Sequence, residues 1–379
     1  MEFPSTYMDF DGNEQPINLH VLLADNMVGK SAILKALRIA LSVCFQKMSK
    51  EAKIGYPFNT TINREEHRVL GNDIYNDLAN EVSIFVELYW HLSGDILIKK
   101  GTLPVNFKTF IFGKFKNSVK GKAMNYTPNQ HIASSFLNNY NRVLEKKEGV
   151  NPLFLYIGTE YIHVQQSNSR SFDLNGASEQ GYWYCLDDSN MEKYVFNWFE
   201  KLKKTINEQE KSEAAYIMLG GNFPAFVLDT FQIAVQSVLP EITQIEWVLN
   251  TLSKAKEKEY LPVFKIEKEG YRTYDMLSDG YRYLVLLIGE MVVRGTLLNK
   301  HIKNDILKEL TGVVLIDEFG IHLHPGMQSE TLGRLSKTFP QLQFIITTHS
   351  PLLINGLRKE QIHILREAED GTRLLNILR

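Results

Sequence analysis

Short apolar runs and longer stretches with helical spacing alternate along the chain, most regularly at its two ends. Near the start, an apolar run at 17–23 precedes a stretch at 30–47 in which Leu34, Leu37 and Leu41 fall on one helical face. The last hundred residues repeat this plan, with helices expected at 284–294 and 324–339 and buried strands at 312–316 and 343–347. Strands that alternate with helices predict a parallel sheet covered by helices.

The middle of the chain has a different pattern. Runs that predict strands lie at 81–91, 96–122, 152–157, 262–267 and 270–274, and helical spacing lies at 191–213 and 223–239. We therefore expect an α/β fold with two lobes, residues 1–160 and 276–379, around a parallel-rich sheet. Residues 161–275 are expected to form a mainly helical insertion between them.

Composition narrows the class of protein. The 379 residues are 44% hydrophobic, which is enough for a sizeable core. Because 42 Lys and Arg are balanced by 44 Asp and Glu, the molecule as a whole has no positive field that would attract nucleic acid. The composition leaves room for a local basic patch. With only Cys44 and Cys185, a disulfide scaffold is not expected. No apolar run reaches the roughly 20 residues of a membrane span and the N-terminus lacks a signal-peptide plan, so we expect a cytoplasmic protein.

The segment 24–31 lies where a predicted strand gives way to a helix. Its final residues, Gly29, Lys30 and Ser31, match the end of a phosphate-binding loop. In such a loop backbone N–H groups surround the phosphates, a Lys binds the β and γ oxygens and a hydroxyl binds Mg²⁺. Asp25 and Asn26 belong to the same loop and to the same candidate site. A helix that simply begins with Gly-Lys-Ser is the structural alternative.

Two predicted strands near the C-terminus end in polar side chains. Asp317 and Glu318 follow the strand at 312–316, at the edge where open α/β sheets bind ligands. Asp317 is a candidate Mg²⁺ ligand, and Glu318 a candidate general base for an attacking water. His349 follows the strand at 343–347, where an imidazole can hydrogen-bond a γ-phosphate and respond to its loss. A structural histidine and a chance Asp-Glu pair are the alternatives.

A further motif, Leu-Ser-Asp-Gly-Tyr-Arg at 277–282, leads into the helix expected at 284–294. Ser278 can cap that helix, and Gly280 lets backbone amides approach an anion closely. Leu277 and Asp279 complete this second candidate nucleotide-binding segment. A capped helix start that binds nothing is the structural alternative.

The four motifs occur in one order, and in this order the chain resembles the ABC-type ATPase heads of the Rad50, SMC, RecF and OLD families. It resembles more closely the bacterial ATPases once labelled predicted ATP-binding proteins involved in virulence. The residues that carry this likeness are the motif at 277–282, His-Leu-His-Pro at 322–325 and Thr-Thr-His-Ser-Pro at 347–351. The resemblance spans nearly the whole chain, with its specific residues near the two ends.

The resemblance implies an ATPase that uses ATP and Mg²⁺. In such heads the nucleotide on Lys30 and Asp317 of one subunit is covered by Ser278 and Gly280 of another, which implies a homodimer or higher oligomer held together by ATP. Members of this group often stand beside an HNH-type nuclease in Septu-like and retron-linked anti-phage systems, so a separate nuclease partner is implied. A RecF- or SMC-like DNA repair ATPase and a nucleotide-bound scaffold without hydrolysis are the alternatives.

The chain departs from these relatives at three positions. Ala24 and Met27 stand where relatives usually have Gly, which narrows the backbone conformations of the loop. Gly320 stands where relatives tend to have Asp, two residues after the general base. Because the Lys, Ser, Asp, Glu and His of the motifs remain, we expect ATP to bind. Because the loop departs from that of its relatives, we expect hydrolysis to be slow or to occur only with a partner.

Further features have both a structural and a functional interpretation. The stretch 99–122 interleaves Lys with Phe, which suits a nucleic-acid surface but equally a sheet with lysines on its outer face. Trp198 and Phe199 fit either a partner-docking site or the core.

Two pairs of polar residues are also ambiguous. His322 and His324 can ligate a metal with Glu318 or shape the turn into a helix opened by Pro325, and we expect no transition metal there. Gln165 and Gln166 are candidates for the glutamine that senses Mg²⁺ in ABC heads, or are surface residues.

Overall fold

The structure is a computed structural model, and it describes residues 6–8, 14–24, 30–45, 48, 81–90, 105–114, 130–159, 161–163, 177–187, 191–218, 221–251, 259–302, 305–367 and 373–377. Several sequence predictions lie outside these residues. They concern Asp25, Asn26, Met27, Gly29, Gln165, Gln166 and much of the lysine-rich stretch 99–122.

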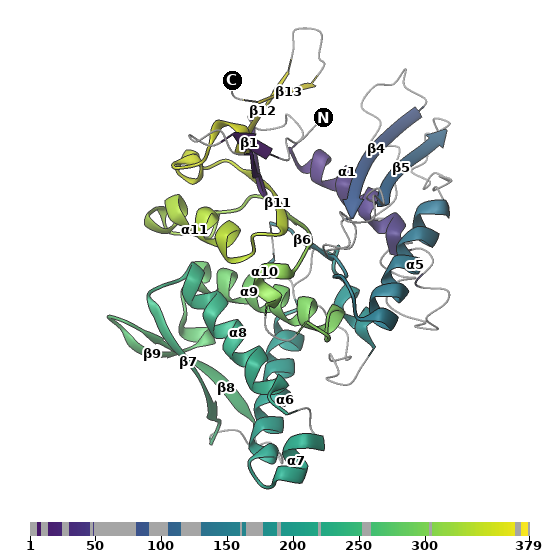
Figure 1. The fold of residues 1–379 in the computed structure, drawn as a ribbon. Coiled ribbons are helices and arrows are strands. Elements are labelled where there is room, and N and C mark those ends of the chain that lie inside the picture. The colour runs from purple at the N-terminus through teal and green to yellow at the C-terminus, as the bar shows by residue number, and fades with distance from the viewer. Residues whose placement is uncertain are drawn as a thin grey trace, which may run out of the picture.

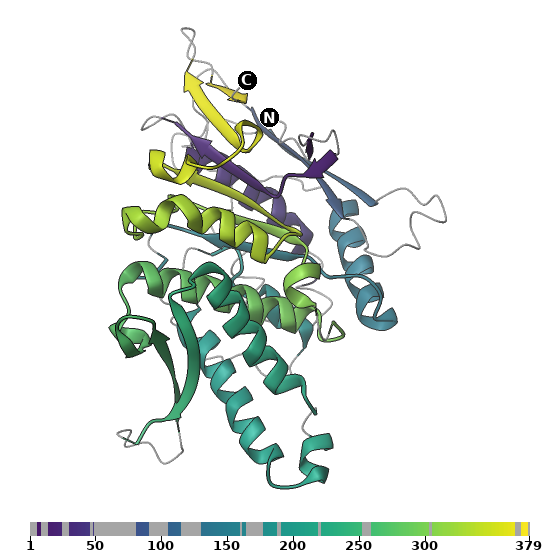
Figure 2. The same cartoon turned by 60° about the vertical axis from the view of Figure 1, so that its left-hand side comes forward.

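A six-stranded sheet forms the centre of the protein (Figures 1 and 2). Its strand order is β13-β12-β3-β11-β10-β6. The strands are Leu19–Leu23 (β3), Leu153–Ile157 (β6), Gly312–Ile316 (β10), Leu342–Thr348 (β11), Ile362–Glu367 (β12) and Arg373–Ile377 (β13). All neighbours are parallel except β12 and β13. The predicted parallel-rich sheet is therefore confirmed, with β3 from the first third of the chain between β11 and β12 from the last.

Helices cover both faces of this sheet, as the buried, almost uniformly apolar strands β3, β6, β10 and β11 require. Helix α1 (Lys30–Ser42) lies on one face and α11 (Pro325–Thr338) on the other (Figure 1). Helix α1 ends five residues before the predicted limit and continues as a 3-10 turn, Val43–Phe45. The short helix α10 (Ile306–Glu309) precedes β10.

Helix α9 (Asp279–Leu298) is the central helix of the molecule, and residues 283–298 are all buried. It lies between β6 and a helical layer made of α6 (Glu192–Gln209) and α8 (Phe223–Val238), with α7 (Glu213–Met218) at the far end. Trp198 and Phe199 are buried in α6, which confirms that they belong to the core. An antiparallel sheet completes this part, with β7 (Ile242–Leu249), β8 (Tyr260–Ile266) and β9 (Gly270–Thr273).

Smaller elements surround the central sheet. They are the antiparallel pairs β1 (Thr6–Met8) with β2 (Glu14–Pro16) and β4 (Glu81–Trp90) with β5 (Val105–Lys114), and helix α5 (Gln130–Lys146). None of the helices in the described part of the chain combines the length and apolar character that crossing a membrane demands. The division into residues 1–160, 161–275 and 276–379 stays a prediction.

Candidate nucleotide-binding site

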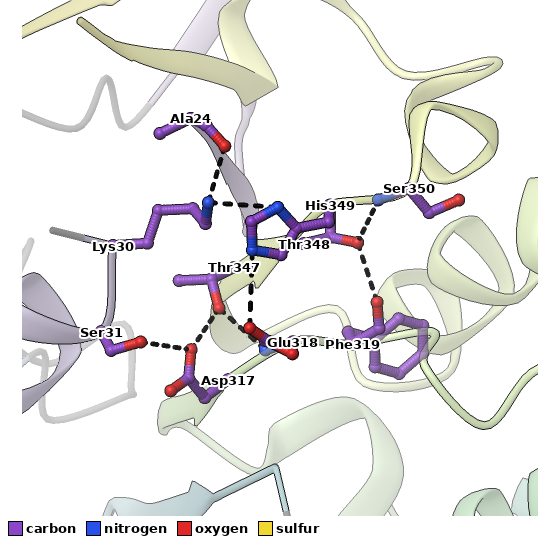
Figure 3. Close-up of polar contacts among 10 residues, drawn as sticks. All are labelled: Ala24, Lys30, Ser31, Asp317, Glu318, Phe319, Thr347, Thr348, His349 and Ser350. Carbon is purple, nitrogen blue, oxygen red and sulfur yellow. Dashed lines mark hydrogen bonds and ion pairs between the residues drawn. The ribbon is translucent and has the colours of Figure 1, made fainter. Parts of the chain in front are cut away.

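Polar groups that follow three neighbouring parallel strands meet at the carboxyl edge of the sheet. Ala24 follows β3, Asp317 follows β10, and His349 follows β11, which lies between the other two. Because parallel strands all end at the same edge, segments almost 300 residues apart in sequence lie side by side there (Figure 3).

Lys30 is the first residue of α1, and its side chain is buried. Its ammonium donates to the Ala24 carbonyl oxygen at 2.6 Å and lies 3.4 Å from Nδ1 of His349. Nε2 of His349 lies 3.5 Å from Oε1 of Glu318. An ammonium can only donate, so an imidazole that accepts at Nδ1 carries its proton on Nε2 and presents it to Glu318. The three side chains thus form a chain of polar contacts, drawn in Figure 3.

Asp317 is buried beside two hydroxyl groups. Thr347 donates its Oγ1 hydroxyl to Oδ1 of Asp317 at 2.5 Å, and Ser31 Oγ lies 3.4 Å from the same oxygen. Adjacent oxygen ligands on an octahedral Mg²⁺ are about 2.9 Å apart, given metal–oxygen distances near 2.05 Å. The Ser31 and Asp317 oxygens are 3.4 Å apart, so the Ser31 side chain would have to move slightly closer for the two to occupy neighbouring positions around a magnesium ion.

Thr347 is a site residue that sequence reasoning missed. Its hydroxyl binds Asp317 and also accepts the backbone N–H of Glu318 at 2.8 Å. The hydroxyl of the next residue, Thr348, donates to the Phe319 carbonyl at 2.9 Å. Strand β11 therefore holds the backbone that carries both carboxylates, and the Thr-Thr pair directly before His349 was the available signal.

The turn after β10 has unusual backbone conformations. Glu318 has a φ of 52°, which costs a non-glycine residue about 1–2 kcal/mol, and Gly320 has a φ of 98°. A Cβ on Gly320 would lie 2.6 Å from Cδ1 of Leu353. The positive φ thus favours glycine at the position where relatives tend to have Asp, and a side chain there would have to displace the end of Leu353.

The Leu-Ser-Asp-Gly motif lies at the start of α9, where Leu277 and Gly280 are buried and Ser278 and Asp279 are exposed. Ser278 occupies the N-cap position, but its hydroxyl makes no capping hydrogen bond, so the expected side-chain cap is wrong. The backbone of Ser278 has the extended conformation that is usual at an N-cap, and its side chain is exposed to solvent. A Cβ on Gly280 would lie 2.8 Å from the His322 carbonyl oxygen, so the motif packs directly on the turn that follows Glu318.

The two histidines of that turn have structural roles. Nδ1 of His324 accepts the backbone N–H of Gly326 at 3.2 Å and caps α11, which begins at Pro325. Nε2 of His322 lies 3.5 Å from the Thr159 carbonyl oxygen. The interpretation that His-Leu-His-Pro shapes the entry into a helix is confirmed.

A buried histidine pair joins β3 to the neighbouring strand β12. Nδ1 of His20 lies 3.1 Å from Nε2 of His363. Burial, followed by the charge of His363, lowers the pKa of His20 to about 3, and burial lowers the pKa of His363 to about 4. Both rings are therefore neutral in the folded protein near pH 7.

Lowering the pH from 7.5 to 5 is expected to reduce the free energy of unfolding, because unfolded histidines take up protons below about pH 6.5 and the folded pair does not. The histidine pair makes its full contribution to the free energy of unfolding above pH 6.5, and this contribution is lost progressively as the pH falls towards 4. Urea titrations across this range measure it. The double variant H20N/H363Q, whose amides replace the two contacting ring nitrogens, should have a shallower pH dependence, whereas the control H163N, at an exposed histidine, should keep the wild-type slope. Equal slopes for all three proteins would contradict the prediction.

The sheet, with these motifs at its carboxyl edge, defines an α/β fold of the ABC-type ATPase head. The chain belongs to the family described as "AAA domain, putative AbiEii toxin, Type IV TA system", whose model matches residues 129–355.

Curated relatives carry names from two defence systems. The chain is 39% identical over 223 residues to "Retron Vc95 probable ATPase" of Vibrio cholerae serotype O1 biovar El Tor, covering 52% of this chain and 43% of the relative. It is 32% identical over 133 residues to "Septu protein PtuA" of Bacillus mycoides (strain KBAB4), covering 32% of this chain and 18% of the relative. The matches therefore span less than half the length of these relatives.

A solved structure whose backbone follows a similar path is described as the Smc head bound to the C-winged helix domain of ScpA. It has 12% sequence identity and a TM-score of 0.48, and the match covers 96% of this chain and 92% of that one.

Proposed function

We propose that the chain is an ATP-binding head that acts as a nucleotide-gated dimeric switch in prokaryotic anti-phage defence, where it controls a separate nuclease of HNH type. Nucleotide binding is supported above all by the position of four side chains close together at one edge of the sheet, those of Lys30, Asp317, Glu318 and His349. The retron and Septu names of the relatives support the defence role.

Each side chain has a role in this proposal. Lys30 exchanges the Ala24 carbonyl and His349 for the β and γ oxygens of ATP, while Ser31 and Asp317 hold Mg²⁺. The bound ion neutralises charge on the phosphates. Glu318, whose side chain is about a third exposed, accepts a proton from the attacking water, and His349 donates a hydrogen bond to the γ-phosphate. His349 already touches both Lys30 and Glu318, so it is well placed to respond when that phosphate leaves.

A second copy of the head completes each site in this proposal. The exposed Ser278 hydroxyl, which does not cap its own helix, is available to a nucleotide on another head. Three exposed apolar side chains flank the Leu-Ser-Asp-Gly motif (here called the signature motif), the Asp-Glu turn and His349; they are Met276, Ile321 and Leu352. Apolar side chains around a polar site are typical of surfaces that a partner covers.

Turnover is proposed to be slow, below about 1 s⁻¹, the low end of ordinary enzymes. Ala24 and Met27 restrict the phosphate-binding loop, as set out above, and the ammonium of Lys30 is held by a carbonyl oxygen that ATP must replace. A repair ATPase is the rival proposal, and strong stimulation of turnover by DNA would favour it. Direct nucleic-acid binding through the lysine-rich stretch stays a prediction.

Mixing two inactive variants tests the proposal. K30A loses the phosphate contact of its own site, and S278R, with a bulky cation in place of the hydroxyl, blocks the site of its partner. Each variant alone is expected to lack ATP-dependent dimers in light scattering and to lack ATPase activity. A mixture contains heterodimers with one intact site, so both properties should return in part.

The outcomes separate the two parts of the proposal. Wild-type activity in K30A would contradict the nucleotide site. Folded variants that each lack activity but do not complement when mixed would contradict the shared site while leaving nucleotide binding in place.

A further inference from the structure

Gln328 lies on the first turns of α11, and its buried amide connects two loops at the edge of the site. Nε2 donates to the Gly320 carbonyl oxygen at 3.0 Å and to the Leu323 carbonyl oxygen at 2.9 Å. Oε1 accepts the Ser350 hydroxyl at 2.5 Å. One side chain therefore holds both the turn that follows Glu318 and the residue that follows His349.

Only a glutamine meets all of these demands at this position. A primary amide supplies two donors and an acceptor from one planar group, whereas a glutamate offers acceptors alone and a methionine of similar length offers neither. Both donors are satisfied by carbonyl oxygens, and the acceptor is satisfied by a hydroxyl. A buried network of this kind is rigid when every member is paired, and it loses most when one partner is removed.

The turn needs such a restraint, because Glu318 has a positive φ, which is unfavourable for a residue with a Cβ. Unfavourable backbone conformations persist only where the surroundings hold them. Thr347 and Thr348 hold the first half of the turn, through the Glu318 N–H and the Phe319 carbonyl. Gln328 holds the second half, at Gly320 and Leu323.

We infer that Gln328 is a positioning residue that fixes the Glu318 carboxylate and the His349 imidazole relative to each other for ATP hydrolysis. This inference rests on the proposed function. The two side chains come from different strands, and Gln328 is attached to the chain beyond each of them, by Gly320 on one side and Ser350 on the other. Among the residues that the structure describes, its hydrogen bonds reach neither Lys30 nor a proposed Mg²⁺ ligand, so it acts through the backbone that carries Glu318 and His349.

The same amide also connects to the signature motif. Leu323 and His322, at the end of the turn, pack against Gly280, where an added Cβ would lie 3.3 Å from Cδ2 of Leu323. A continuous path of contacts thus runs from Ser350, next to His349, through Gln328 and Leu323 to the loop that carries Ser278. Loss of the γ-phosphate at one site can in this way affect the loop that serves the nucleotide on the partner head.

Replacing Gln328 by Met tests the positioning role. The side chain keeps its approximate volume but loses all three hydrogen bonds. Single-turnover and steady-state assays are expected to give a kcat about 10- to 100-fold lower, with KM and ATP affinity within about twofold of wild type, since small displacements of reacting groups cost this much. In the E318Q background, which already lacks the general base, Q328M should add little. If Gln328 had only a structural role, Q328M would lower stability but would not lower kcat while leaving KM unchanged.

Three further variants keep the test informative if Q328M folds poorly. S350A removes the hydroxyl, and with it both the contact to Gln328 and the cap on the Leu352 N–H, and should lower kcat. S350T, which retains a hydroxyl for both contacts, should restore it. S329A, at the exposed neighbouring position on α11, should match wild type. Wild-type kcat in Q328M or S350A overturns the positioning role alone. A wild-type protein that binds no ATP, or never hydrolyses it, overturns the proposed function and the role of Gln328 with it.

Discussion

Replacing Glu318 by Gln is expected to lower the single-turnover rate constant for ATP cleavage by about 10²- to 10⁴-fold, the usual contribution of a general base. The amide keeps the length of the side chain and its contact with His349 but cannot accept the proton of the attacking water. ATP affinity should be nearly unchanged, because Lys30, Ser31 and Asp317 remain. Rapid-quench assays measure the rate, and E330Q, at an exposed position on α11, is the matched control.

The same variant should trap the ATP-bound dimer. If hydrolysis weakens the interface between two heads, E318Q with ATP remains dimeric in size-exclusion chromatography long after wild type has returned to monomer. Wild-type behaviour in both assays would contradict a hydrolysing switch. It would favour a scaffold that binds nucleotide only to stabilise an assembly.

Replacing Arg294 by Met is expected to produce the largest loss of stability, about 3–5 kcal/mol in the free energy of unfolding, the cost of leaving a buried charge without its partner. On α9 the Arg294 guanidinium pairs with Glu290 at 2.6 Å, and both side chains are buried. Arg294 also donates to the Gly181 and Trp183 carbonyl oxygens at 2.9 and 2.7 Å. Tyr161 donates its hydroxyl to the other Glu290 oxygen, so the variant leaves a carboxylate in an apolar interior.

Urea unfolding followed by circular dichroism measures this effect. The double variant E290M/R294M removes both charges and should be less destabilised than R294M alone. R334M breaks an Arg–Glu pair with the same four-residue spacing on the exposed face of α11, and should change stability by less than about 1 kcal/mol. A loss in R294M no larger than in R334M would contradict the assignment of α9 as the helix that organises the core.

The sequence predicted local features well where each depended on neighbouring residues. The apolar strands that end in Asp317 and His349, the helix that begins at Lys30 and the β8–β9 pair all lie where patterning placed them, within a few residues. It missed α5, although the apolar residues of that helix have clear helical spacing, and β7, along which buried and exposed residues do not alternate. It also missed β12 and β13 at the sheet edge. Buried Trp198 and Phe199 could not be told from an exposed pair, since burial depends on what packs against α6.

By itself, the sequence determined which residue types stand at the ends of which strands, because apolar runs and the polar residues that follow them are local properties. It named Lys30, Ser31, Asp317, Glu318 and His349 before any contact was known. Only the tertiary structure decided that β11 lies between β3 and β10 and so brings these groups together. It alone decided that Gly320 needs a positive φ, that Ser278 does not cap its helix and that Gln328 joins two loops. The physical reason is that strand order and hydrogen bonds between distant segments depend on the packing of the whole chain, which no short stretch of sequence encodes.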